Sequence, residues 1–215
     1  MIRSAIVLCR DKHEPVGAYG AMFRCAARLQ LQYPQHIWRA AFREHPPYLY
    51  QVIRDCQRYG VQEYILLPWH LEPYTTTLPQ GWQCAPPLGQ HPLMQAIVTQ
   101  RALEAHYTHQ PQAALTRALN EQTWYVHAAH ATVAGITSMD VATLATRLSS
   151  APPTLPLVVQ PLALSQLDPL YGHVQTLIAE QAREASVHVA KAIEYDRRLI
   201  EIVVELVRPL LGNPA

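Results

Sequence analysis

Residues 4–9 read Ser-Ala-Ile-Val-Leu-Cys and form a short, apolar, β-branched run near the start of a chain of 215 residues. Such a run is typical of a strand that is buried on both faces. Downstream, strand-like runs alternate with stretches of helical spacing, such as residues 48–59, which Gly60 follows at the C′ position, just past the end of the helix. This alternation predicts an α/β fold in which helices cover both faces of a parallel sheet.

The strand–helix pattern occurs twice along the chain. Residues 105–122 interrupt it, and the strand-like run 123–129 starts it again. When the halves are aligned, the second is about 27 residues shorter before its Pro161, which is the length of one strand–helix unit. The repeat predicts half-domains over residues 1–104 and 123–215, a linker over 105–122, and a second half that lacks about one strand–helix unit. A chance likeness between similar strand–helix units is the alternative.

The composition limits the partners that we expect. Asp, Glu, Lys and Arg make up 15% of the residues, and the net charge is +1 with histidine neutral. No cluster of Lys and Arg is present to neutralise phosphates, so no nucleic-acid partner is predicted. No apolar run approaches the ~18 residues of a membrane span, and charge comes too early for a signal peptide. The four cysteines lack C-x-x-C spacing, which predicts a cytoplasmic protein with reduced thiols.

Several segments match the landmarks of one protein family. They are Ile65–Leu71 (ILLPWHL), Ala85–Gln90 (APPLGQ), Val126–Thr132 (VHAAHAT), Val158–Leu164 (VVQPLAL) and Tyr171–Ile178 (YGHVQTLI). In these segments the chain resembles the class II chelatases, of the CbiX/sirohydrochlorin chelatase type. The resemblance implies two doubly wound, flavodoxin-like half-domains with parallel sheets. It also implies a lyase of cobalamin or siroheme biosynthesis that inserts Co²⁺, Fe²⁺ or Ni²⁺ into sirohydrochlorin or a related tetrapyrrole.

The resemblance also implies which residues bind the metal. His130 and His173 stand at the two metal-binding histidine positions of the family, both in the second half, whereas Arg10 occupies the first of these positions in the first half. Neutral imidazoles suit these divalent ions and can accept a pyrrole proton, so both histidines are predicted metal ligands and catalytic bases. His130 follows a strand and His173 is expected to open a helix, which places both at the sheet edge where α/β proteins bind ligands. An ordinary surface or hydrogen-bonding role is the alternative for each.

A tetrapyrrole with several carboxylates also needs cationic or polar partners. Arg10 and Lys12 follow the first strand, and His70 follows a later strand of the same half. We therefore expect these three residues to bind the substrate. Ordinary solvated loop charge is the alternative for Arg10 and Lys12. No G-x-G-x-x-G segment or P-loop is present, so no nucleotide cofactor is expected.

Departures from the family pattern leave other functions open. Ala131 replaces the glycine that follows the first histidine, and Leu177 replaces an acidic residue. These changes favour a catalytically degenerate protein that binds a tetrapyrrole or a metal without turnover. The final helix, Leu199–Leu211, has a broad apolar surface. It allows an assembly subunit or a homo-oligomer, and burial of this helix in the protein's own core is the alternative.

Overall fold

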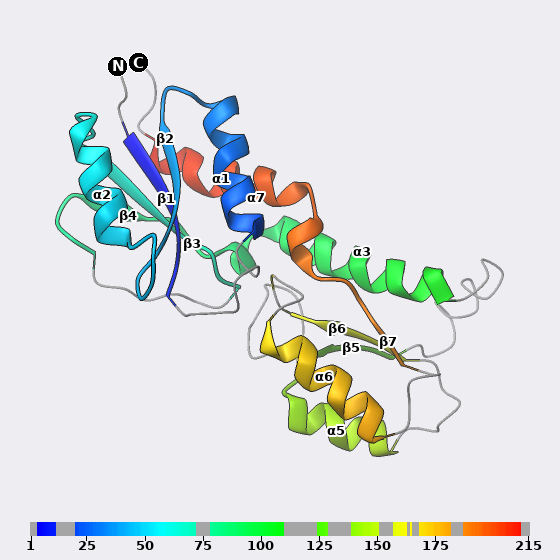
Figure 1. The fold of residues 1–215 in the computed structure, drawn as a ribbon. Coiled ribbons are helices and arrows are strands. Elements are labelled where there is room, and N and C mark those ends of the chain that lie inside the picture. The colour runs from blue at the N-terminus through cyan, green and yellow to red at the C-terminus, as the bar shows by residue number, and fades with distance from the viewer. Residues whose placement is uncertain are drawn as a thin grey trace. The chain divides into compact units, whose positions relative to one another are not determined.

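The computed structural model describes residues 4–11, 20–71, 78–109, 124–128, 139–150, 157–162, 164, 168–181 and 187–211 (Figure 1). The chain divides into two compact units: Met1–His91 with Asp196–Ala215, and Pro92–Tyr195. Each unit contains a parallel sheet with helices packed on it. The predicted α/β class is therefore confirmed.

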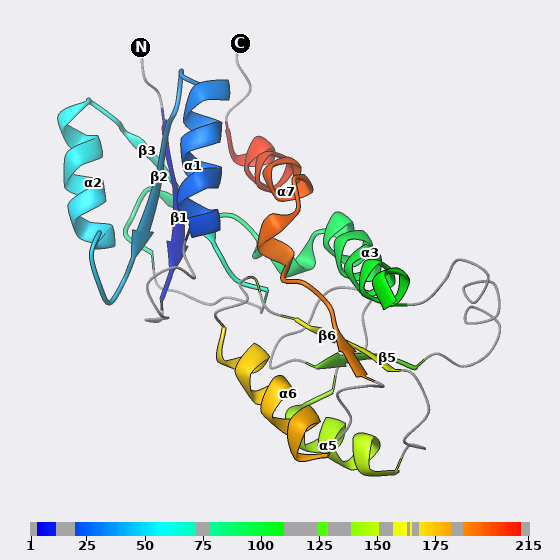
Figure 2. The ribbon, with the colours of Figure 1, turned by 45° about the vertical axis from the view of Figure 1, so that its right-hand side comes forward.

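The first unit is built on a four-stranded parallel sheet in the order β2-β1-β3-β4. The strands are β1 (Ser4–Arg10), β2 (Ile37–Phe42), β3 (Glu63–Pro68) and β4 (Trp82–Cys84). The helices are α1 (Gly20–Gln32), α2 (Leu49–Arg58) and α7 (Arg198–Val207), with short 3₁₀ turns η1 (Leu88–Gln90) and η3 (Arg208–Leu210). Helix α2 covers one face of the sheet, while α1 and α7 cover the other (Figure 2). Every residue of β1 is buried between these layers.

Apolar side chains under α2 form one core of this unit. Val52 and Cys56 of the helix pack on Ala5 and Val7 of β1. At the margin of this core the rings of Tyr64 and Trp82 stack at 4.8 Å, with 7° between their planes. Beyond α2, Gly60 has a φ of +74°, in the left-handed region that favours glycine. The glycine predicted at the C′ position is thus in place, directly after the C-cap residue Tyr59.

The second unit has a three-stranded parallel sheet in the order β5-β6-β7. Its strands are β5 (Trp124–Ala128), β6 (Leu157–Pro161) and β7 (Val187–Val189), and its helices are α3 (Pro92–His109), α5 (Val141–Ser150), α6 (Pro169–Glu180) and the 3₁₀ turn η2 (Ile193–Tyr195). Helices α5 and α6 lie on one face of the sheet and α3 on the other (Figure 1). Leu144, Val159 and Val174 belong to the core under α5 and α6.

The two sequence halves exchange their last helices. Helix α3 follows β4 in the chain but packs on β6 and β7, and α7 follows β7 but packs on α1 and β3. For this reason the boundaries of the compact units differ from those of the sequence half-domains predicted over residues 1–104 and 123–215. The second unit begins at Pro92, and the first takes in Asp196–Ala215. Of the expected linker, residues 105–109 belong to α3, and the rest lies outside the described residues.

Sheet order shows which strand of the first unit has no counterpart among the described residues of the second half. Strands β5, β6 and β7 correspond to β1, β3 and β4, and no counterpart of β2 is found among the residues described there. Helix α5 lies on the face opposite α3, just as α2 lies opposite α7 (Figures 1 and 2). Because α3 and α7 are equivalent last helices, α5 corresponds to α2. The elements without a counterpart in the described part of the second half are therefore α1 and the edge strand β2.

Candidate functional site

The carboxyl ends of β5 and β6 lie next to each other. Ala128, the last residue of β5, pairs with Pro161, the last residue of β6. The two segments that follow these strands therefore begin at the same edge of the sheet, the edge at which α/β proteins bind ligands. His130 comes two residues after Ala128 and lies outside the described residues. His173 belongs to the helix that follows β6.

His173 lies in the second turn of α6 and not at its start. The helix begins at Pro169, and the Leu170 N–H donates to Asp168 Oδ1 at 2.9 Å. An aspartate N-cap followed by proline is a strong helix start. The expectation that His173 opens the helix was therefore wrong: the helix begins about one turn before His173. The imidazole is exposed while its neighbours Tyr171 and Val174 are buried. It is therefore accessible to a ligand.

A buried polar contact ties the start of α6 to the sheet. The Tyr171 hydroxyl donates to the Ala190 carbonyl at 3.1 Å, just beyond β7. Burial raises the pKa of Tyr171 far above its usual range, although a hydrogen bond from the Gln160 side chain acts in the opposite direction. The hydroxyl therefore stays protonated and remains a donor. Gln160 is itself 1% exposed, and its Nε2 donates to the Pro161 carbonyl at 2.8 Å.

These two residues were not among the predicted site residues. Gln160 is a polar residue inside an otherwise apolar, fully buried strand, and such a side chain needs a buried hydrogen-bond partner. Tyr171 stands two residues before His173. The polar interruption in the strand is the signal that could have found Gln160, whereas nothing in the sequence alone marks Ala190 as the partner of Tyr171.

Arg10 ends β1 at the carboxyl edge of the first sheet, as predicted. It pairs with Phe42 of β2, and its carbonyl accepts a hydrogen bond from the Arg43 N–H at 3.2 Å. Arg10 is only 9% exposed, and its role in binding a substrate stays a prediction. Lys12 falls outside the part of the chain that the structure describes.

His70 lies at the same edge of the first sheet. It follows β3, whose last residue Pro68 pairs with Cys9 of β1. The neighbouring Trp69 is 1% exposed and its N–H donates to the Cys9 carbonyl at 2.7 Å, which fixes the chain at this point. A Cβ on Gly89 would overlap the Leu71 carbonyl. Glycine is therefore required where η1 approaches the segment that carries His70.

Thiols and acidic clusters do not supply a metal site in this part of the molecule. Burial raises the pKa of Cys9 and of Cys25 to about 12, and only a thiolate binds metal well. Among the described residues, no group of three or more His, Cys, Asp or Glu is placed to hold a metal ion.

The same residues include no helix long and apolar enough to cross a membrane.

Comparison by sequence identifies no relative: no protein-family model and no curated protein matches the chain. Solved structures match nearly its whole length. CbiX, described as the terminal enzyme for siroheme biosynthesis in denitrifying bacteria, is 16% identical over 98% of this chain and 100% of its own, with a TM-score of 0.62. SirB from Bacillus subtilis with Fe³⁺ is 11% identical over 98% of this chain and 96% of its own, with a TM-score of 0.66. The sirohydrochlorin chelatase SirB from Bacillus subtilis subspecies spizizenii, in complex with cobalt, is 13% identical over 99% of this chain and 97% of its own, with a TM-score of 0.62.

A third protein extends the comparison. DR2241 from Deinococcus radiodurans is 15% identical over 96% of this chain, with a TM-score of 0.60. This chain spans only 54% of DR2241, which is described as a multi-domain protein with structural similarity to chelatases and two additional novel domains. The chain has a class II chelatase-like fold. The resemblance found in the sequence landmarks is thus confirmed, and the class II chelatase-like fold is shared despite identities of 11–16%.

Proposed function

We propose that this protein inserts a divalent metal ion into sirohydrochlorin or a related tetrapyrrole. The observation that carries the proposal is the likeness to CbiX and SirB, each of which is matched over at least 96% of its length. One SirB structure holds Fe³⁺ and another holds cobalt. Co²⁺, Fe²⁺ and Ni²⁺ are the ions that we propose as substrates, because imidazole nitrogen binds each of them well.

His130 and His173 are the proposed metal ligands. Both follow the neighbouring strands β5 and β6, whose carboxyl ends pair at Ala128 and Pro161. In insertion, the macrocycle loses two pyrrole protons and gains one M²⁺, so two bases are needed for each metal ion. Neutral imidazoles can deliver the ion and then accept these protons. Support for His173 comes from its exposure on α6 and from the fixed start of that helix.

Residues at the carboxyl edge of the first sheet are the proposed partners of the substrate carboxylates. Arg10 presents a permanent positive charge there, and its guanidinium fork matches carboxylate geometry. His70 lies at the same edge, and Lys12 is proposed with them from its place two residues after Arg10. The proposed location in the cell is the cytoplasm.

Metal insertion is tested by following the absorption spectrum of sirohydrochlorin after addition of Co²⁺, Fe²⁺ or Ni²⁺. We expect the double variant His130→Ala/His173→Ala to lose insertion, with a fall in rate of at least about 100-fold if each imidazole contributes as a general base. Gln175→Ala is the matched control, because Gln175 is an exposed residue two positions beyond His173 on the same helix. An unchanged rate in the double variant would refute the assignment of the histidines.

A second candidate is tetrapyrrole binding without turnover. Leu177 occupies the position at which the family pattern has an acidic residue, and it packs in the core under α5 and α6. This position therefore offers no carboxylate to a metal or a proton. Titration of the wild-type protein with sirohydrochlorin separates the candidates: saturable binding with no spectral change on addition of any of the three metals would favour this second function.

A further inference from the structure

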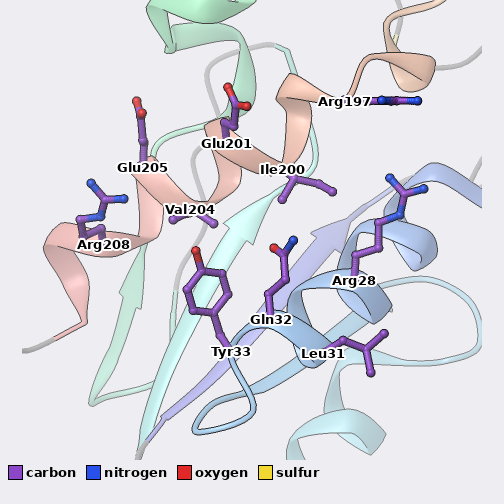
Figure 3. A pocket seen from close by; sticks show the side chains of 10 residues that line it. All are labelled: Arg28, Leu31, Gln32, Tyr33, Arg197, Ile200, Glu201, Val204, Glu205 and Arg208. Carbon is purple, nitrogen blue, oxygen red and sulfur yellow. The ribbon is translucent and has the colours of Figure 1, made fainter.

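A groove on the first unit lies between α1 and α7 (Figure 3). It encloses about 630 Å³, within the range of small-molecule sites. Residues of α1 and the turn after it form one side, and residues of α7 with the residue on either side of that helix form the other: Arg28, Leu31, Gln32, Tyr33, Arg197, Ile200, Glu201, Val204, Glu205 and Arg208. The proposed metal-insertion chemistry uses none of these residues.

The groove is far along α1 from the carboxyl edge of the sheet. Helix α1 starts after the carboxyl end of β1 and ends shortly before Ile37, where β2 begins. Its last turn, which carries Arg28 and Leu31, therefore lies toward the amino edge of this sheet. A ligand bound in the groove would occupy a site separate from the edge that holds Arg10 and His70.

Three arginines and two glutamates, Glu201 and Glu205, line the groove, so positive charge is in excess by one. Figure 3 shows the side chains of Arg28 and Arg197 at one end and Arg208 beside Glu205 at the other. Glu205 Oε2 already pairs with His91 Nε2 at 2.9 Å. Within the described residues, none of the ion pairs uses the guanidinium of Arg28 or Arg197.

Arg198, the residue after Arg197, differs from it because its guanidinium is held in an ion pair. Arg198 is held by Asp196, with Nε donating to Oδ1 at 2.9 Å and Nη2 donating to Oδ2 at 2.7 Å. This bidentate pair uses the only carboxylate next to Arg197 in the sequence. Arg197 is exposed and lies at the same end of the groove as Arg28 (Figure 3).

Apolar side chains form the wall between the charged ends. Ile200 and Val204, one turn apart on α7, are half-buried, and Leu31 is 83% exposed. An exposed leucine opposite an apolar helix stripe offers contact area to a ligand with an apolar body. Two guanidinium groups at one end match two carboxylates, because each can form a bidentate pair.

We propose that the α1–α7 groove binds a small dicarboxylate whose two carboxylates meet Arg28 and Arg197 and whose apolar body packs on Leu31, Ile200 and Val204. This site is additional to the proposed metal-insertion site and does not depend on it. The charge pattern favours a dianion over a monoanion, and the apolar wall favours a ring or alkyl body over a fully polar one.

Calorimetric titration of the full chain with benzene-1,3-dicarboxylate tests the proposal. We expect saturable binding at one site with a dissociation constant of about 1 mM or lower. Arg28→Gln/Arg197→Gln should weaken it at least about tenfold, since two charge-assisted contacts are lost. Arg54→Gln/Arg58→Gln removes the same charge from exposed positions on α2, across the sheet, and should leave the affinity unchanged.

Two further ligands separate the parts of the proposal. Benzoate should bind more weakly than the dicarboxylate because it reaches one guanidinium, and equal affinity would overturn the two-arginine arrangement. Citrate should also bind more weakly because it lacks the apolar body, and equal affinity would overturn the role of the apolar wall. Absence of saturable binding by benzene-1,3-dicarboxylate, or equal affinity in the Arg28→Gln/Arg197→Gln variant, would overturn the site itself. All four arginines are exposed, so folding is expected to survive these substitutions.

Discussion

Replacing Tyr171 by Phe removes one oxygen atom from the contact that fixes the start of α6. The hydroxyl donates to the Ala190 carbonyl at 3.1 Å, and Tyr171 and Ala190 are 5% and 1% exposed. Water therefore cannot replace the lost donor without opening the structure. A buried acceptor left without its partner costs about 1–3 kcal/mol. The Gln160 amide loses its contact with the hydroxyl in the same variant but keeps its hydrogen bond to the Pro161 carbonyl, so we expect a total near 2–3 kcal/mol.

Hydrogen–deuterium exchange measures this loss where it occurs. If α6 opens locally, a cost of about 2–3 kcal/mol corresponds to about 30- to 150-fold faster exchange of its amides. Peptides that cover Pro169–Glu180 should show the change, whereas peptides from α2 in the other unit should not. Tyr59→Phe is the control, because this side chain is 62% exposed. Unchanged exchange in α6 of the Tyr171→Phe variant would refute the view that this contact holds the helix.

Three other predictions follow from buried or crowded positions. Gly89→Ala places a Cβ into a neighbouring carbonyl and should lower the melting temperature by several degrees; an unchanged melting curve would contradict this close approach. His91→Ala removes the buried partner of Glu205 and should cost about 1–3 kcal/mol in urea unfolding, with no loss expected if the pair is only a surface contact. Burial raises the pKa of Cys9 and Cys25 from 9.0 to about 12, so the free energy of unfolding should fall as pH rises from 9 toward 12, where thiols ionise only in the unfolded chain. The double replacement of both cysteines by Ala should reduce this fall.

Much of the fold is predictable because its strands are short apolar runs with few alternatives. The run at 4–9 becomes β1 (Ser4–Arg10), and the helical stretch at 48–59 becomes α2 (Leu49–Arg58). His173 was expected to open its helix, but α6 spans Pro169–Glu180. The error has a specific cause: Asp168 and Pro169 form the N-cap and first position, whereas Gly172 is tolerated inside the helix.

The exchange of helices is not predictable from local pattern. An amphipathic helix shows which of its faces is buried but not which sheet it covers. In α7, Leu199, Ile202, Val203 and Val207 are buried, so that face is used inside the first unit. The expected role of the final helix in a homo-oligomer stays a prediction, and the half-buried Ile200 and Val204 belong to the groove described above.

The candidate site was predictable where it depends on strand ends. Arg10 and His70 lie at the edge expected for them, because residues that follow parallel strands share one edge of the sheet. His173 lies on the helix that follows β6 but one turn further in than expected. Gln160 and Tyr171 were not predicted, since their contact joins β6, α6 and the segment after β7. The approach of His130 to His173 stays a prediction.

The described parts of the two halves lack different elements. In both, the pair of neighbouring strands whose carboxyl ends carry the candidate site residues is kept: β1 with β3 in the first unit and β5 with β6 in the second. In the first unit, the described residues between β3 and β4 contain no helix that corresponds to α6. In the second, the described residues contain no counterpart of α1 or of the edge strand β2. An edge strand pairs on one side only, so its loss removes one ladder, whereas loss of β6, which pairs with both β5 and β7, would divide the sheet. The ladder that ends at Ala128 and Pro161 is retained. A shortened second half can therefore still present the segments that carry His130 and His173 side by side.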